Sequence, residues 1–210
     1  MAKKVLITIS REYGSGGILL ANELGKKLGI PVYDKELLFQ MSNESVKNKS
    51  IHDQVEKNVE NADYYFHLGG TKFLGASGVL TEIALHERVY TNQRDVILEA
   101  AKQSCIILGR CSGNILKQDP DVVRVFVRAE VADKKKRAIE VYKDDAENIE
   151  KILHDMDMRR ANYFNYFTNE VWGKINNYDL VVNTSKVGIE GAADTIIAYV
   201  QARDEKRSDA

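Results

Sequence analysis

Apolar residues near the N-terminus form a short continuous run that is followed by a helical repeat. The run at residues 5–9 has the pattern of a strand that is buried on both faces of a parallel sheet. Leu20, Leu24 and Leu28 then recur at every fourth position, and a glycine and a proline follow within residues 29–31. This order predicts a strand, a turn and a helix that ends near residue 28.

The same alternation of strand and helix patterns continues along the chain. Further strand patterns lie at residues 31–34, 105–108, 121–127 and 178–183. Helical spacing lies at residues 35–41, 42–66, 79–103, 133–142, 146–168 and 188–202, and residues 203–210 form a charged tail that we expect to fray. Strands that alternate with helices predict an α/β fold with a parallel sheet of about five strands flanked by helices. We expect residues 1–202 to form one domain.

Composition excludes several classes of protein. Thirty basic residues face 31 acidic ones in 210, so no overall charge favours nucleic acid or an anionic membrane. Cys105 and Cys111 do not form a CxxC pattern, and the four histidines lack metal-ligand spacing. No stretch approaches the roughly 18 apolar residues of a membrane span, and no signal peptide is evident, so we expect a cytoplasmic protein.

A glycine-rich segment separates the first strand from its helix. Gly14, Ser15, Gly16 and Gly17 stand at this turn. Glycine allows positive φ and close approach of the backbone, so N–H groups here can surround an anion at a helix N-terminus. The segment therefore predicts binding of a nucleoside triphosphate. A glycine turn that merely packs closely against its strand is the alternative.

The spacing departs from the standard phosphate-binding loop, in which a glycine and four further residues precede Gly-Lys-Ser/Thr. With Gly16 as the second glycine, Arg11 takes the place of the first. Gly17 then takes the place of the lysine, and Ile18 that of the hydroxyl that binds magnesium. Arg11 is the nearest cation that could replace the lysine.

Three other segments carry candidate site residues. Asp34 and the pair Gly109 and Arg110 follow predicted strands, at the edge where parallel sheets bind ligands. Asp34 equally suits the N-cap of the next helix, whereas the planar fork of an arginine suits a phosphate. Within residues 146–168, Asp155, Asp157, Arg159 and Arg160 favour either a binding role or simple helix ion pairs. The basic run at residues 134–137 predicts a solvated helix face.

Five segments together resemble the cytidylate kinase-like family, relatives of bacterial CMP kinases. They are ISREYGSGG, VYDKELL, ILGR, DMDMRRANYF and YDLVVNTSKVGIE, in this order. The resemblance covers about residues 5–199 and implies the P-loop nucleoside monophosphate kinase fold. It also implies an acceptor-side helical insertion over about residues 42–78 and a lid helix over about residues 146–168. ATP and Mg²⁺ would be the cofactors, and nucleotides the substrates.

The resemblance also assigns roles to individual residues. It implies that Asp34 helps to hold the nucleoside monophosphate and that Gly109 and Arg110 contact the acceptor phosphate. Asp157 and Arg160 match the lid, where Asp157 would orient the lid and Arg160 would stabilise charge on the transferred group. Arg110, Asp157 and Arg160 are thus the candidate catalytic residues, and Arg11 with Gly14, Ser15, Gly16 and Gly17 the candidate donor site.

Two departures from the family keep alternatives open. Cys111 replaces an aspartate that is usual in CMP kinases, and Ile18 replaces the basic residue that usually follows the glycines. The implied function is transfer of the γ-phosphoryl group of ATP to a nucleoside monophosphate such as CMP or dCMP. The alternatives are a nucleotide-binding sensor with little or no activity, and a small-molecule kinase with another acceptor.

Overall fold

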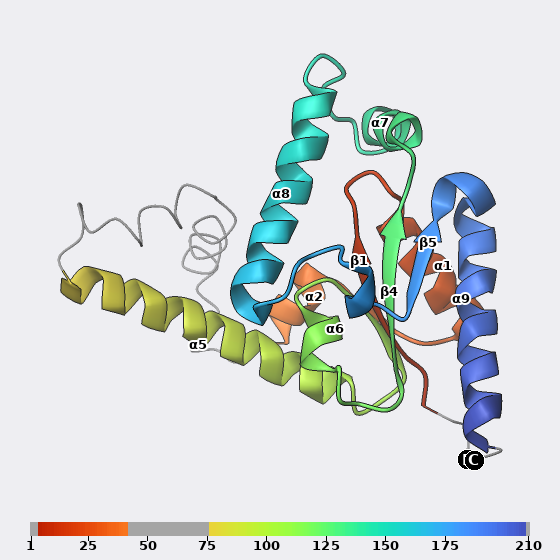
Figure 1. The fold of residues 1–210 in the computed structure, drawn as a ribbon, viewed down its shortest axis with the longest axis horizontal. Helices are drawn as coiled ribbons and strands as arrows, with labels where there is room; N and C mark the ends of the chain where they lie inside the picture. The colour runs from red at the N-terminus through yellow and green to blue at the C-terminus, as the bar shows by residue number, and fades with distance from the viewer. Residues whose placement is uncertain (1–3, 42–75, 209–210) are drawn as a thin grey trace.

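The computed structural model describes residues 4–41 and 76–208 (Figure 1). The predicted acceptor-side insertion at about residues 42–78 lies almost entirely outside this range.

Five parallel strands form the sheet at the centre of the described chain. They are β1 (Leu6–Arg11), β2 (Val32–Tyr33), β3 (Cys105–Leu108), β4 (Val122–Arg128) and β5 (Leu180–Asn183). Their order in the sheet is β2-β3-β1-β4-β5, and every neighbouring pair is parallel. The predicted α/β fold class is confirmed. Since all strands run in one direction, the loops that follow β1, β3 and β4 meet at a single edge of the sheet.

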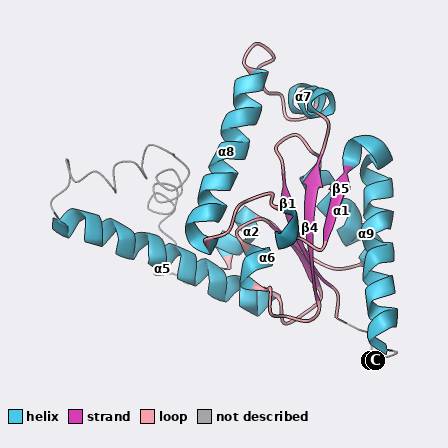
Figure 2. Ribbon diagram, in the orientation of Figure 1, coloured by secondary structure: helices cyan, strands magenta, loops and turns pink. Residues whose placement is uncertain are grey.

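Helices cover both faces of the sheet (Figures 1 and 2). The helices are α1 (Gly17–Leu28), α2 (Lys35–Gln40), α5 (Ala76–Ala100), α6 (Ser112–Ile115), α7 (Val131–Glu140), α8 (Ile149–Thr168) and α9 (Thr184–Ser208), with a 3₁₀ turn at Ile175–Asn177. α1 and α9 pack together on one face, while α2, α5 and α6 lie on the other. α7 and α8 pack against each other beyond the carboxyl ends of the strands.

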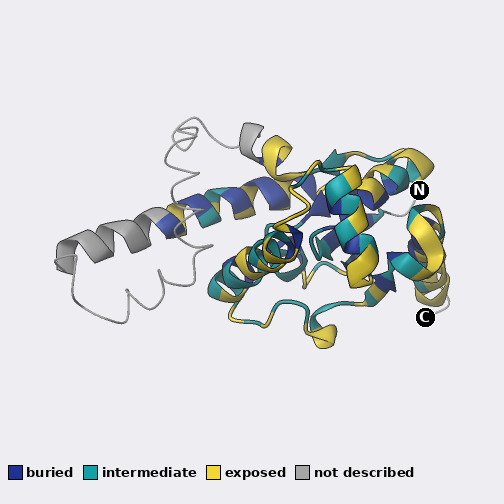
Figure 3. Ribbon diagram, turned by 90° about the horizontal axis from the view of Figure 1, so that it is seen from above, coloured by how far each residue is buried: buried dark blue, intermediate teal, exposed yellow. Residues whose placement is uncertain are grey.

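Alternate side chains of the strands supply two separate cores. Ile7 and Ile9 on β1 pack with Leu20 and Leu24 of α1 in one core. Leu6, which points to the opposite face, packs with residues of α2 and α5 in the second core. This burial on both faces is why the strand pattern in the sequence is continuous rather than alternating. Figure 3 shows buried positions concentrated where helices meet the sheet, with exposed positions on the outer helices.

The C-terminal segment differs from the frayed tail that the sequence predicts. α9 continues as helix through Ser208. Arg203 Nη1 donates to the carbonyl oxygen of Asp121 at 2.5 Å, and Arg207 pairs with the Asp121 carboxylate at 3.2 Å. These contacts to the start of β4 hold the last turns, so the expectation of fraying is wrong for residues 203–208. Gly188, with φ 70° and ψ −178°, breaks the helix near its start.

Candidate functional site

The glycine segment forms a tight loop between β1 and α1. Gly14 and Gly16 have φ of +73° and +84°, which disfavours any other residue at these positions. Ser15 is fully buried, and its Oγ donates to the Glu12 carbonyl oxygen at 2.7 Å. Thr184 Oγ1 donates to the carbonyl oxygen of Ser15 at 2.7 Å. Hydrogen bonds around the loop therefore hold it in one shape.

The first N–H groups of α1 are available to a ligand. Gly16 caps the helix without a side-chain hydrogen bond. Within the described chain, no backbone acceptor receives the N–H groups of Gly16, Gly17 or Ile18. Unsatisfied N–H groups and the positive end of the helix dipole favour an anion at this position. The loop thus leaves N–H groups exposed to an anion at the start of α1, although the lysine and hydroxyl of the standard loop are absent.

Two basic residues of α7 contact this loop. Arg137 Nη1 donates to the Gly14 carbonyl oxygen. Lys134 is 8% exposed and pairs with Asp157 at 2.9 Å and with Glu12 at 3.4 Å. The prediction that residues 134–137 form a solvated face is therefore wrong for these two positions. They stand three apart on one side of the helix, and this spacing was the available signal in the sequence.

The lid-helix candidates do come together with the loop. Asp157 Oδ1 accepts the backbone N–H of Tyr13 at 2.5 Å. Arg160 donates to the carbonyl oxygen of Arg11 at 2.9 Å, and its Cζ lies 5.4 Å from the centroid of the Tyr13 ring. Asp157 and Arg160 also form an ion pair with each other at 3.8 Å. The alternative of simple helix ion pairs is thus incomplete, because each residue also binds the end of β1 or the turn after it.

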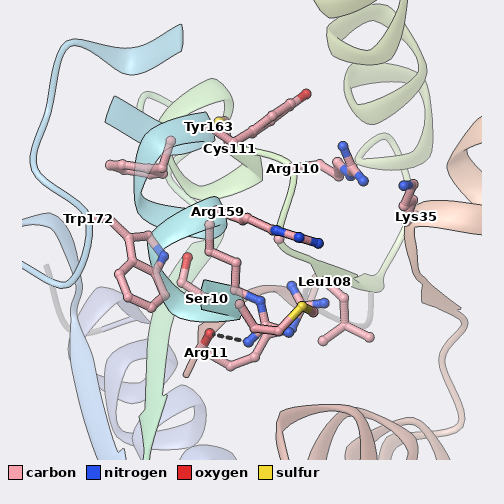
Figure 4. A pocket seen from close by; sticks show the side chains of 13 residues that line it. Ser10, Arg11, Lys35, Leu108, Arg110, Cys111, Arg159, Tyr163 and Trp172 are labelled. Carbon is pink, nitrogen blue, oxygen red and sulfur yellow. Dashed lines mark hydrogen bonds between the residues drawn. The ribbon is translucent and has the colours of Figure 1, made fainter. Parts of the chain in front are cut away.

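A cavity of about 310 Å³ opens at the carboxyl edge of the sheet, beside the loop (Figure 4). Its lining contains basic residues and no carboxylate among the described residues. The basic residues are Arg11, Lys35, Arg110, Arg159 and Arg160. The remaining wall is apolar and aromatic and includes Leu108, Cys111, Met156, Tyr163, Phe164 and Trp172. Such a lining suits an anion that also presents an apolar surface.

Strained backbone places Arg110 in this cavity. Arg110 and Cys111 have φ of +54° and +57°, a left-handed conformation that costs a residue with a side chain about 1–2 kcal/mol. Gln93 Nε2 donates to the Arg110 carbonyl oxygen at 3.2 Å, and Tyr163 donates its hydroxyl to Gln93 Oε1 at 3.2 Å. The Arg110 guanidinium lies 5.0 Å from the centre of the Tyr163 ring. These contacts from α5 and α8 hold the strained turn and orient the guanidinium.

Like charges surround Arg11 at the centre of the site. Burial first, and then the positive charges of Arg160 and Arg110, lower the pKa of Arg11 to about 9. The side chain stays protonated at neutral pH. Its Nε is buried and finds no hydrogen-bond partner in the part of the chain that the structure describes. An anion bound between these arginines would relieve both the repulsion and the unsatisfied donor.

Asp34 and Cys111, which the sequence also singled out, differ in their relation to the cavity. Asp34 Oδ1 accepts the N–H groups of Glu36 and Leu37 at 3.0 Å, so Asp34 caps α2, and Lys35 rather than Asp34 lines the cavity. Cys111 is 4% exposed, and burial raises the pKa of its thiol to about 12. A neutral thiol thus stands where the related CMP kinases are expected to carry an aspartate.

The site offers few ligands to a metal. In residues 4–41 and 76–208, no group of three His, Cys, Asp or Glu side chains is arranged to hold an ion. Ile18, in the place of the usual hydroxyl, has no ligand atom in its side chain. These residues do not form a Mg²⁺ site of their own, so Mg²⁺ would have to arrive on the phosphates of a nucleotide.

Comparison with known proteins decides the family. The sequence model of the cytidylate kinase-like family matches residues 6–186. The chain belongs to this family. None of the curated proteins matches the chain. None of the described helices is long and apolar enough to span a membrane.

Solved structures with TM-scores above 0.5 share this fold. An uncharacterized protein from Eubacterium ventriosum ATCC 27560 is 26% identical, with a TM-score of 0.72 over 94% of this chain and 99% of the other. TT1252 from Thermus thermophilus is 14% identical, with a TM-score of 0.53 over 96% and 98% of the two chains. Shikimate kinase from Bacteroides thetaiotaomicron is 13% identical, with a TM-score of 0.49 over 94% and 98%. The family and the sheet together establish a P-loop kinase-like α/β fold.

Proposed function

We propose that this family member is a phosphotransferase that moves the γ-phosphoryl group of ATP to a nucleoside monophosphate such as CMP or dCMP. The observation that carries the proposal is the cavity lined by basic side chains and no described carboxylate, directly beside a glycine loop with free N–H groups. Donor and acceptor phosphates would then meet at one edge of the sheet. Phosphoryl transfer requires this close approach of two anions.

The donor would lie on the glycine loop. Backbone N–H groups of Gly16, Gly17 and Ile18 would bind its phosphates at the N-terminus of α1. Arg137 stands at the rim of the loop, where its Cζ lies 3.3 Å from the position of a Cβ built on Gly16. Mg²⁺ would enter with ATP, bound to phosphate oxygens, and would reduce the repulsion between the two substrates.

The acceptor phosphate would lie in the cavity. Arg110 and Arg159 reach it from β3 and α8, and Lys35 reaches it from the start of α2 (Figure 4). The planar guanidinium of Arg110 can bind two phosphate oxygens at once. Asp34, which caps α2 through Oδ1, would act on the nucleoside side through its other carboxylate oxygen.

The reaction needs little covalent chemistry from the protein. An oxygen of the acceptor phosphate forms a bond to the γ-phosphorus, while the bond from that phosphorus to the bridging oxygen breaks and ADP leaves with the electron pair. A doubly ionised phosphate is already a nucleophile, so no side chain must remove a proton. Arg160 would stabilise charge on the transferred group, and Asp157 would hold α8 against the loop through Tyr13.

The cavity also favours a second candidate, a kinase for another phosphorylated or carboxylated small molecule. Its wall at Cys111 is neutral and apolar, and this position packs with Tyr163 and Phe164. An amino group of cytosine would find no carboxylate there. A nucleotide sensor without activity is the third candidate, and the missing loop lysine is its support.

An ATP-consumption assay with Mg²⁺ distinguishes the three candidates. Nucleoside monophosphates with each base and a panel of anionic small molecules would be offered as acceptors, and formation of ADP and of phosphorylated product would be followed. We expect product with CMP or dCMP. Product with a non-nucleotide acceptor alone would support the second candidate. Binding of MgATP without product from any acceptor would support the sensor.

A further inference from the structure

The side chain of Arg11 and the missing side chain of Gly17 are complementary in space. A Cβ built on Gly17 would lie 2.8 Å from both Cβ and Cγ of Arg11, which is closer than real side chains approach. Gly17 is not among the residues with positive φ and stands in the first turn of α1. Its backbone therefore does not require glycine. Glycine is required here because the side chain of Arg11 occupies the space that a side chain at position 17 would need.

The guanidinium of Arg11 continues from Gly17 toward the acceptor side. A Cβ built on Gly109 would collide with Arg11 Nη1. Arg11 thus extends from the glycine loop to the turn that carries Arg110, and it lines the cavity there. No described residue forms an ion pair or accepts a hydrogen bond from this guanidinium, and its Nε is buried. A fully formed cation therefore lies between the proposed donor and acceptor positions, with no anion of residues 4–41 and 76–208 bound to it.

The standard phosphate loop has the opposite arrangement. There, a glycine stands at the position of Arg11, and a lysine that reaches the β- and γ-phosphates stands at the position of Gly17. We infer that these two positions have exchanged roles, so that Arg11 supplies from the end of β1 the cation that the lysine supplies from α1. Gly17 is a glycine because the two side chains cannot occupy the same space. This inference rests on the proposed donor site.

The exchange has a chemical consequence. A lysine ammonium is a single compact charge, whereas a guanidinium presents several N–H donors in one plane. Because Arg11 reaches Gly109, it can contact the transferred phosphoryl group from the acceptor side as well as the donor side. Arg11 is thus a substrate-binding residue between both phosphates, and Arg160 fixes its backbone through the Arg11 carbonyl oxygen.

A reciprocal substitution tests the exchange. Arg11→Met keeps the stem and removes the charge, and we expect MgATP affinity in calorimetry to fall at least about tenfold. Gly17→Lys alone should also bind MgATP poorly, because two side chains compete for one space. The double variant Arg11→Gly/Gly17→Lys should recover affinity to within about threefold of wild type. Lys136→Met, which removes an exposed cation of α7, is the matched control and should bind like wild type.

A second measurement tests the shared space without any ligand. Alanine normally stabilises a helical position relative to glycine. We expect Gly17→Ala to lower the melting temperature of wild type, and to raise it or leave it unchanged in an Arg11→Gly background, which removes both the Cβ and the Cγ that the added methyl group would meet. The same downward shift in both backgrounds would overturn the claim of shared space. Wild-type affinity of Arg11→Met for MgATP would overturn the role of Arg11 as the replacement cation.

Failure of this inference differs from failure of the proposed function. If MgATP binding depends on Arg11 but no acceptor yields product, the exchange stands and the proposed phosphotransferase does not. If wild type forms product and Arg11→Met binds MgATP and turns over equally well, the phosphotransferase stands and the exchange does not. Wild type that binds no MgATP would overturn both.

Discussion

Lys134 on α7 lies with its Nζ 2.9 Å from Oδ2 of Asp157 on α8. The same ammonium lies 3.4 Å from Glu12, directly before the glycine loop, and the side chain of Lys134 is only 10% exposed. Asp157 in turn accepts the N–H of Tyr13. One buried lysine therefore joins the loop, α7 and α8, and we expect the rigidity of the proposed donor site to depend on it.

We expect Lys134→Met to lower the free energy of unfolding by about 2–3 kcal/mol, because it removes the cation that lies between two partly buried carboxylates and leaves Asp157 only the more distant Arg160. Urea denaturation measures this change. Lys135→Met is the matched control, since its partner Glu150 has a side chain that is 79% exposed, and it should unfold at the same urea concentration as wild type. Equal stability of the two variants would contradict the role of Lys134. Adding Asp157→Asn to Lys134→Met should recover part of the loss.

Gly16→Ala should weaken MgATP binding by about tenfold or more. The added Cβ would lie 2.6 Å from Ile189 Cδ1 and 3.3 Å from Arg137 Cζ at a position with φ +84°, so the loop or these two side chains must move. Gly29→Ala is the control, because Gly29 also has positive φ, +65°, but its Cβ would meet no atom within 4 Å. Both variants carry the backbone cost of about 1–2 kcal/mol, whereas only Gly16→Ala should lose affinity in calorimetry. Wild-type affinity of Gly16→Ala would remove the loop as the donor site.

Arg110→Lys should raise the KM for the acceptor by about tenfold or more while MgATP affinity holds, because the change keeps the charge but loses the planar fork. Steady-state kinetics with the acceptor varied, together with calorimetry, separate the two effects. Lysine at φ +54° carries the same backbone cost as arginine, so folding should be unaffected. Arg88→Lys, an exposed position on α5, is the control. Loss of MgATP affinity with unchanged acceptor kinetics would assign Arg110 to the donor instead.

Arg160→Ala should lower kcat by about 10²-fold or more and weaken MgATP binding much less, because its charge would act mainly on the transition state. Single-turnover kinetics on the active acceptor measure the chemical step directly. Lys151→Ala, on an exposed position of the same helix, should turn over like wild type. A wild-type kcat in Arg160→Ala would show that its contacts with Arg11 and Tyr13 are structural only.

Local patterns in the sequence were sufficient for the framework of the fold. The strand at residues 105–108 was predicted with its observed bounds, and the helix before Gly29 ends where expected. These elements are readable because side-chain periodicity and glycine act over a few residues. Bounds were less accurate where tertiary contacts extend an element, as in the last turns of α9.

The site was only partly predictable. The sequence singled out the glycine loop, Arg110, Asp157 and Arg160 because each lies in a recognisable segment, and their roles stay predictions. Lys134, Arg137 and Lys35 were not singled out, because the helical spacing of Lys134 and Arg137 places them on one face but does not say whether that face is buried or solvated. Lys134 lies 122 residues from Glu12 in the sequence, yet it pairs with Glu12 across the loop.

The sequence by itself determined the alternation of strands and helices and the glycine loop, because both follow from the conformational preferences of neighbouring residues. Only the tertiary structure decided which cations converge. The order β2-β3-β1-β4-β5 places the ends of β1 and β3 side by side, and this brings Arg11 against both Gly17 and Gly109. The contact of Arg11 with Gly17 and Gly109 depends on hydrogen-bonded pairing between strands that are distant in the sequence. It also depends on the absence of side chains at both glycines, because Arg11 occupies that space. Neither constraint acts between residues that are neighbours in the chain.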